Sequence, residues 1–164
     1  MTAPVTLYGI PPGEAGAKQT CIIMRDLIRK GRANPLVRQT AAALVRYLPQ
    51  KDYLGEAAAV HAFVRDCVRY VRDIRDVETL HAPEFILQNG YGDCDDKSIL
   101  AASMLESLGH KTRLHIVGPE RGRGFCHVYV DVFIDGAWHA VECTEPVQFG
   151  WAPPDMKNHF VREV

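Results

Sequence analysis

Apolar residues recur at helical spacing in three segments of the first half of the chain. The first stripe runs from Ala17 to Lys30. The second begins at Asn34-Pro35, where asparagine can cap a helix and proline suits its first turn, and ends near Pro49. The third runs from Leu54 to Arg72. The pattern therefore predicts three consecutive helices.

The second half of the chain changes from helical spacing to alternation. A short helix is predicted from Pro83 to Asn89 and a longer one from Cys94 to Leu108. Strands are predicted for Thr112 to Val117, for Cys126 to Ile134 and, after a turn at Asp135-Gly136, for Ala137 to Cys143. Because the helices come first and the strands later, the order favours an α+β fold.

The chain has the length of one domain, with 164 residues. Within this single domain we expect an extended arm over residues 1–16, a helical half over 17–75, a core that carries the chemistry over 76–152 and a surface-wrapping tail over 153–164. We expect a helix that carries the candidate nucleophile to pack on an antiparallel sheet.

Composition limits the classes of function. Hydrophobic residues make up 47% and charged residues 24%, which is typical of a soluble globular protein. The sequence has no long apolar run and no basic, apolar start, so we expect a cytoplasmic protein without a membrane segment. The five cysteines are odd in number and widely spaced, which favours reduced thiols and gives no pattern for a metal site or another cofactor.

Charge is balanced overall but not along the chain. The net charge of -1 gives no reason to expect nucleic acid as a partner. Residues 1–75 hold 12 Lys/Arg against 6 Asp/Glu, a net of +6, and residues 76–164 hold 7 against 14, a net of -7. We favour two solvated faces that attract each other within one fold. The alternative is a basic helical face that docks on a partner protein.

The hairpin turn places two chemically important side chains together. A two-residue turn at Asp135-Gly136 pairs Tyr129 with Glu142, and directly opposed residues share a face of the sheet. His127 shares this face and becomes a diagonal neighbour of Glu142, about 7–8 Å away between backbones. A carboxylate that reaches an imidazole is the base and orienting group of a nucleophilic triad.

Cys94 is the candidate nucleophile. It lies where the loop Gly90 to Asp93 turns into a helix, and a helix N-terminus stabilises a thiolate and offers backbone donors to an oxyanion. The carboxylates of Asp93, Asp95 and Asp96 oppose this effect, because nearby negative charge raises a thiol pKa. A protonated His127 would have to outweigh them. The other four cysteines are expected to pack in the interior.

These segments resemble the transglutaminase-like superfamily. The run Tyr91-Gly92-Asp93-Cys94-Asp95-Asp96 with the helix after it is similar to the nucleophile block of that family. The run from His127 to Val132 and the run Val141-Glu142-Cys143-Thr144 resemble its histidine and carboxylate strands, so the resemblance covers about residues 76–152. Val77 to Leu80 upstream is similar to stand-alone proteins of this type that phages and prophages carry.

The resemblance implies a papain-like fold in which Cys94 is the nucleophile, His127 the base and Glu142 the orienting group. The family usually has Asp followed by Pro where this chain has Glu142-Cys143. The extra methylene moves the carboxylate, and a catalytic pair is sensitive to such a shift. Asp131 is therefore a second, weaker candidate for the third member.

Three further residues are candidates for supporting roles. Gln88 precedes Cys94 by six residues, the offset at which papain-like proteases carry an oxyanion donor, and an ordinary polar residue near a helix end is an equally good interpretation. Tyr129 can bind the carboxylate or fill space. Trp138 packs on the sheet and can shield the His–Glu pair from water.

Two hypotheses for function follow. The first is cysteine-dependent acyl transfer on peptide or isopeptide amides, with water as the favoured acceptor over a lysine amine. The second is a binding or assembly module with little activity, for example in phage morphogenesis, which the Glu142 substitution and the acidic surroundings of Cys94 favour. A zinc site formed by Cys94, Cys126, His127 and Cys143 is a weak third alternative.

Overall fold

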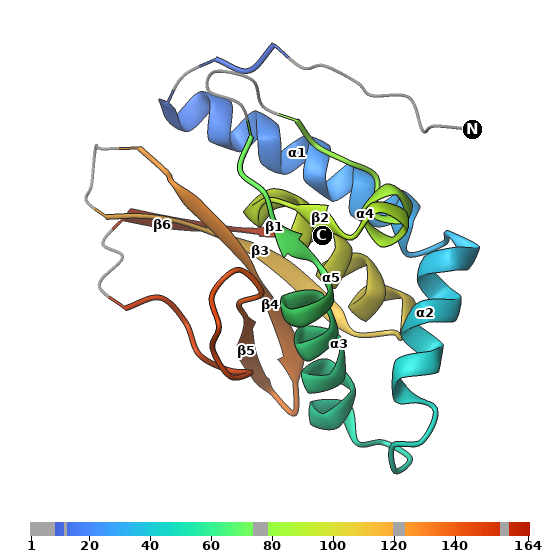
Figure 1. Cartoon of the computed structure of the whole chain (residues 1–164). Helices are drawn as coiled ribbons and strands as arrows, with labels where there is room; N and C mark the ends of the chain where they lie inside the picture. Colours follow the sequence, from blue (N-terminus) through green and yellow to red (C-terminus); the bar gives the residue numbers. More distant parts are fainter. Residues whose placement is uncertain (1–8, 12, 74–78, 120–123, 155–157) are drawn as a thin grey trace.

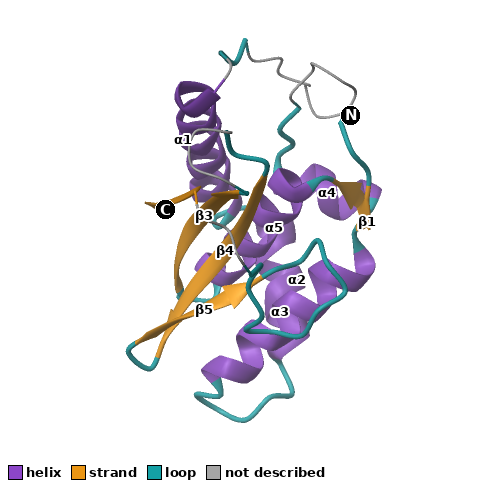
Figure 2. Ribbon diagram, turned by 90° about the vertical axis from the view of Figure 1, so that its left-hand side faces the viewer, coloured by secondary structure: helices purple, strands orange, loops and turns teal. Residues whose placement is uncertain are grey.

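Helices gather on one side of a four-stranded antiparallel sheet (Figures 1 and 2). The computed structural model describes residues 9–11, 13–73, 79–119, 124–154 and 158–164. The helices are α1 (Gly13–Gly31), α2 (Pro35–Val45), α3 (Tyr53–Cys67), α4 (Pro83–Asn89) and α5 (Cys94–Ser107). The sheet has the order β5-β4-β3-β6 and contains β3 (Lys111–Gly118), β4 (His127–Ile134), β5 (Ala137–Val141) and β6 (Asn158–Glu163). The expected α+β fold is confirmed.

Helix α5 lies at the centre of the fold, where it packs against α1 to α4 and against β3 and β4. Ten consecutive residues from Asp96 to Leu105 are buried, so this helix has no solvent-exposed face along most of its length. Its polar side chains are satisfied internally. The Ser103 hydroxyl donates to the carbonyl of Ile99 at 2.7 Å, and the Ser98 hydroxyl donates to the carbonyl of Val128 at 3.3 Å.

The β4–β5 hairpin has the predicted register and faces. Ile134 pairs with Ala137 and Val130 pairs with Val141. The apolar side chains of β4 that alternate with His127, Tyr129, Asp131 and Phe133 are buried in the main core with α5. Asp135 and Gly136 both have positive φ, at 51° and 81°, which is the backbone geometry that a tight two-residue hairpin turn needs.

The third helix is shorter at its C-terminal end than the sequence predicts. Helix α3 ends at Cys67, and the chain continues as the short strand β1 (Arg69–Tyr70), which pairs in parallel with β2 (Tyr91–Gly92). Val68 and Val71 keep the apolar spacing of a helix, but the carbonyls of Gly90 and Gly92 accept from the backbone N–H groups of residues 69 and 71. Tertiary pairing therefore overrides the local helical pattern and holds the loop that precedes Cys94.

Other expectations are corrected at the ends of the chain. Helix α1 begins at Gly13, four residues before the expected start, and the tail forms β6 beside β3 instead of only wrapping the surface. Cys21 and Cys143 are buried as expected, but Cys67 and Cys126 are exposed, because one ends α3 and the other precedes β4. Residues 1–8 and 12 of the arm, 77–78 of the upstream segment and 155–157 of the tail lie outside the described residues.

Within the part of the chain that the structure describes, none of the helices combines the length and the apolar character needed to cross a membrane.

The central position of α5 predicts which leucine is costly to truncate. Leu100 in α5 is fully buried, whereas Leu36 in α2 is 37% exposed. We expect Leu100→Ala to lower the free energy of unfolding by about 2–5 kcal/mol, since it leaves a cavity in the core. Leu36→Ala should cost about 1 kcal/mol or less. Urea unfolding measures both values, and equal losses for the two variants would contradict this account of the core.

Candidate active site

Cys94 is the first residue of α5, and three features fix its position. The side chain of Asp93 caps the helix by accepting the backbone N–H groups of Asp95 at 3.0 Å and Asp96 at 3.1 Å. The β1–β2 pair holds the two residues before the cap. A Cβ atom at Gly92 would lie 2.5 Å from the Cβ of Asp96, so only glycine fits this close turn.

Asp96 is a structural member of the same turn. Its buried carboxylate accepts the backbone N–H of His81 at 2.9 Å and lies 2.8 Å from Nδ1 of the same histidine. Burial raises the pKa of Asp96, and the hydrogen bonds from His81 act against that rise. These contacts tie the segment before α4 to the first turn of α5 and steady the backbone beside Cys94.

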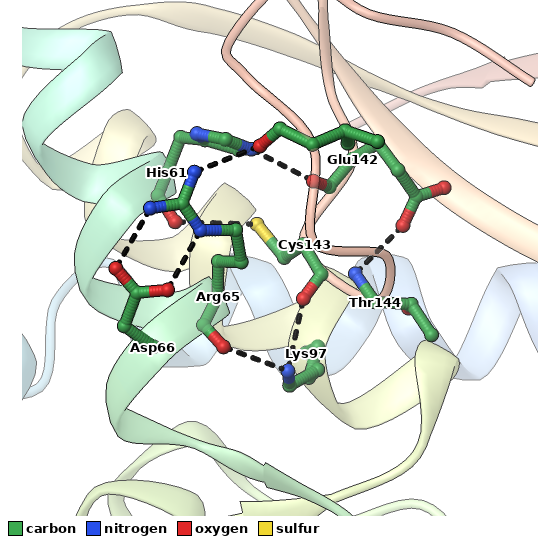
Figure 3. A network of polar contacts seen from close by, with 8 residues as sticks. His61, Arg65, Asp66, Lys97, Glu142, Cys143 and Thr144 are labelled. Atoms are coloured by element: carbon green, nitrogen blue, oxygen red, sulfur yellow. Dashed lines mark hydrogen bonds and ion pairs between the residues drawn. The ribbon is translucent and has the colours of Figure 1, made fainter.

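His127 and Glu142 form the predicted pair. Nε2 of His127, at the start of β4, lies 2.5 Å from Oε2 of Glu142, which follows β5. The other carboxylate oxygen accepts the backbone N–H of Thr144 at 2.7 Å (Figure 3). Because Glu142 engages Nε2, Nδ1 is the ring nitrogen that remains for exchange of a proton with a thiol.

Glu142 is a buried carboxylate that is nevertheless stabilised as an anion. Only 1% of the residue is exposed, and this burial raises its pKa. The hydrogen bond and charge of His127, together with the backbone N–H of Thr144, outweigh burial, and the pKa of Glu142 lies below its ordinary value. The carboxylate can therefore hold the imidazole in one orientation near neutral pH.

Cys94 and His127 line the same cavity of about 680 Å³. The N-terminal segment and α1 contribute Ile10 and Thr20 to its lining, and β3 and β4 contribute as well. The end of β1 contributes Tyr70. Its volume lies in the range of ligand-binding sites, and the cavity is built by parts of the chain that are distant in sequence.

The surroundings of Cys94 keep its thiol protonated in the absence of a positive partner. Burial raises the pKa of the thiol, and the carboxylates of Asp95 and Asp93 raise it further. Hydrogen bonds from the backbone of Val128 and Asp95 act in the opposite direction. The thiol donates to Oδ1 of Asp95 at 3.8 Å. The charge conflict expected from the sequence is therefore present in the structure.

Asp131 and Trp138 both contact Arg113, and neither has a described contact with His127. The Asp131 carboxylate accepts Nε–H of Arg113 at 2.8 Å and lies 3.1 Å from Nδ1 of His115. The ring of Trp138 packs under the guanidinium of Arg113, 4.3 Å from the ring centre. The structure thus assigns Asp131 to a separate ion pair, and Trp138 does not cover the His127–Glu142 pair.

For Tyr129 and Gln88, the structure agrees with the second of the two interpretations that the sequence left open, a packing residue and an ordinary polar residue near a helix end. The Tyr129 hydroxyl lies 2.9 Å from Nδ1 of His115, and its ring stacks on that of His127 with centroids 6.3 Å apart. Tyr129 therefore supports the imidazole by ring contact and does not bind Glu142 in the described contacts. Gln88 is exposed on α4 and is not among the residues that line the cavity, so the structure does not bring it to Cys94.

Two residues that sequence reasoning missed hold the backbone around Glu142. Nε2 of His61 lies 2.8 Å from the carbonyl oxygen of Glu142, and Nζ of Lys97 donates to the carbonyl of Cys143 at 2.9 Å (Figure 3). The sequence carried one signal for Lys97, since it is the only basic residue in the helix and lies three positions after Cys94. His61, on an apolar helical face, gave no comparable signal.

Among the residues that the structure describes, no group of three or more His, Cys, Asp or Glu side chains is arranged to hold a metal ion.

Comparisons with solved structures support the fold. A suggested protease from Parabacteroides distasonis is 11% identical, with a TM-score of 0.61, and the match covers 79% of this chain and 27% of that chain. A suggested cysteine protease from Cytophaga hutchinsonii is 14% identical, with a TM-score of 0.54, over 76% of this chain and 47% of that chain. This chain therefore spans less than half the length of either protein.

The calcium-bound LapG of Legionella pneumophila is similar over most of both chains. It is 15% identical, with a TM-score of 0.59, over 85% of this chain and 87% of LapG. At these identities the likenesses show the fold alone. A search of curated protein sequences found no match.

The family follows from the sequence comparison. The model of the transglutaminase-like superfamily matches residues 39–143, which include Cys94, His127 and Glu142 and make up more than half of the chain. The fold and the order of these three residues agree with that match. The chain belongs to the transglutaminase-like superfamily.

Proposed function

We propose that the protein is a cysteine-dependent acyl-transfer enzyme that hydrolyses peptide or isopeptide amides. Cys94 is the nucleophile, His127 the base and Glu142 the orienting group. The observation that carries this proposal is the bond between Nε2 of His127 and the buried carboxylate of Glu142, at a cavity that also contains Cys94.

The reaction proceeds in two stages. The Cys94 thiol gives its proton to Nδ1 of His127, and the thiolate adds to the carbonyl carbon of the amide. The tetrahedral intermediate collapses, the amine leaves with the proton from His127, and a thioester to Cys94 forms. Water then gives a proton to His127 and attacks the thioester. The carboxylic acid leaves and the proton returns to the Cys94 sulfur.

The N-terminus of α5 is the proposed site of oxyanion stabilisation. The backbone N–H of Cys94 belongs to the first turn of the helix, whose N–H groups have no partner within the helix. The exposed position of Gln88 gives no support to its proposed role as a second donor.

Electrostatics make His127 essential to this proposal. Burial and the carboxylates of Asp95 and Asp93 favour the neutral thiol of Cys94. A thiolate at this position requires the positive charge of protonated His127, which the Glu142 carboxylate stabilises in turn. The proposal therefore assigns Glu142 both an orienting and an electrostatic role.

Water is the proposed acceptor. The cavity is lined by polar and charged groups, including Arg72 and Asp73, which favours access of water to the thioester. The resemblance in fold to two suggested proteases is consistent with hydrolysis. A lysine amine as acceptor would make the enzyme a transglutaminase instead.

A second function is a binding or assembly module with little activity. The raised pKa of the Cys94 thiol favours it, because a protonated thiol is a weak nucleophile. A partner on the basic N-terminal helices and a place in phage morphogenesis belong to this alternative and remain predictions.

Peptide hydrolysis by Cys94 is testable without a known substrate. We expect a synthetic peptide library, incubated with the protein in H2(18)O, to yield new C-termini that carry 18O. Cys94→Ser should lower the yield on the order of a thousandfold or more, because the nucleophile is lost. Mass spectrometry measures the products, and an added lysine derivative would be incorporated if an amine were the acceptor.

Cys67→Ser is the matched control, since Cys67 is an exposed thiol at the end of α3 and is not among the residues that line the cavity. It should leave the yield unchanged. Cleavage that persists in Cys94→Ser would contradict the proposed nucleophile, and a wild-type protein without products would favour the binding module.

The Glu142–His127 pair also predicts how stability depends on pH. The folded pKa of Glu142 lies below its ordinary value of 4.5, so the folded state binds fewer protons there than the unfolded chain. The stability that this carboxylate contributes is present above about pH 4.5 and is lost as the pH falls through the folded pKa. Glu142→Gln should therefore be more destabilising at pH 7 than at about pH 3, measured by thermal unfolding. A deficit that stays constant or grows on acidification would contradict the prediction.

A further inference from the structure

The backbone that carries Glu142 is anchored by buried side chains from two helices. His61 of α3 binds the carbonyl oxygen of Glu142 through Nε2 at 2.8 Å. Lys97 of α5 binds the carbonyl oxygen of the next residue, Cys143, at 2.9 Å (Figure 3). Since β5 ends at Val141, these bonds begin where the sheet no longer holds the chain.

Lys97 is the less expected of the two anchors. Only 2% of the residue is exposed, and its Nζ also donates to the carbonyl of Arg65 near the end of α3, at 3.3 Å. Among the contacts of the described residues, its ammonium binds carbonyl oxygens and forms no ion pair with a carboxylate. A buried ammonium is costly, and an apolar side chain of similar size would pack there at lower cost. Lys97 therefore differs from a methionine or leucine at this position by its N–H donors, which bind the carbonyl oxygens of Cys143 and Arg65.

We infer that Lys97 is a positioning residue for Glu142 and acts through the backbone of Cys143. This inference rests on the proposed function of Cys94, His127 and Glu142. Lys97 lies on α5 three residues after Cys94, so one rigid helix carries both the nucleophile and the anchor of the orienting carboxylate. A shift of α5 would move both ends of the catalytic set together and preserve their relative position.

The extra length of the Glu142 side chain explains why its backbone needs the bond from Lys97. Glutamate is one methylene longer than the aspartate that this family usually has at the position, so its backbone must lie farther from His127 for the same hydrogen bond. The bonds from His61 and Lys97 hold the backbone at the distance at which Oε2 reaches Nε2. Without the Lys97 bond, the carbonyl of Cys143 loses a buried partner and the segment after β5 can move toward solvent.

The first test measures which ring nitrogen of His127 carries a proton, because Glu142 binds this ring and its position determines the answer. Long-range 1H–15N spectra detect both ring nitrogens through the carbon-bound protons and report which nitrogen carries the proton. At alkaline pH, where the imidazolium has lost one proton and the ring is neutral, we expect the remaining proton of His127 on Nε2 in the wild type and a tautomer mixture in Lys97→Met. Lys111→Met is the matched control, because it removes an exposed lysine of β3 that binds Glu163. It should give the wild-type spectrum.

The second test asks whether Lys97 acts through Glu142. We expect Lys97→Met to slow alkylation of Cys94 by iodoacetamide about tenfold to a hundredfold, the usual consequence of a misplacement of about 1 Å. Glu142→Gln should slow it at least as much, and the double variant should be no slower than Glu142→Gln alone. A role confined to stability would leave both the His127 spectrum and the alkylation rate of folded Lys97→Met unchanged. An effect on the rate that is independent of Glu142 would add to that of Glu142→Gln and would also contradict the inference.

Folding is checked in the same samples. Cys21 is buried in α1 and has no described bond to Lys97, so it should stay unmodified in a folded variant, whereas Cys143 lies in the segment that is expected to move. If Lys97→Met exposes Cys21, Lys97→Gln, which keeps an amide donor, replaces it and should give an intermediate tautomer mixture and rate.

The outcomes separate this inference from the proposed function. A wild-type Cys94 that reacts no faster than an ordinary thiol would contradict the proposed function, and the His127 spectra would still decide the role of Lys97. An identical His127 spectrum in the wild type and the folded Lys97 variant would overturn the positioning role, whatever the activity of Cys94. A wild-type ring without a defined Nε2 proton would overturn it as well.

Discussion

The enclosure of α5 is the constraint on which the structure depends. Helices α1 to α4 surround it on one side and β3 and β4 on the other, and its residues from Asp96 to Leu105 are buried. A helix packed in this way has no freedom to rotate or slide without losing contacts on every side. Its N-terminus, with Cys94, is therefore presented to the cavity in a fixed orientation relative to β4, where His127 lies.

The chemistry at this helix end is a balance between opposing charges. Burial and the nearby carboxylates of Asp95 and Asp93 favour a neutral Cys94, whereas backbone hydrogen bonds, including one at the helix N-terminus, favour the thiolate. In the proposed mechanism, the imidazole of His127 adds to this second effect. The buried Glu142 carboxylate binds Nε2 of His127 and holds the imidazole in one orientation. In this account, the thiol is activated only when the imidazole is held in place, so the anchoring of Glu142 by His61 and Lys97 bears directly on reactivity.

The sequence was sufficient where local rules decide the structure. The Asp135-Gly136 turn determined the register of the hairpin. Counting residues back from the turn then placed His127 close to Glu142. The sequence was insufficient where a segment pairs with a strand that is distant along the chain. The apolar spacing past Cys67 indicated more helix, but pairing with the loop before Cys94 formed β1, and β6 formed because β3 offered an unpaired edge. The exposed position of Gln88 and the role of Lys97 depend on tertiary packing, which spacing alone does not report.

The pH dependence of Cys94 alkylation by iodoacetamide, in the wild type and in His127→Ala, tests the central claim most directly. The account predicts that Cys94 of the wild type reacts near pH 6, where an ordinary thiol is almost fully protonated, and that His127→Ala abolishes this reactivity. The buried Cys21 and Cys143 report in the same digest that both proteins remain folded. A Cys94 that reacts only at alkaline pH, with the same profile in both proteins, would contradict the claim that His127 activates it.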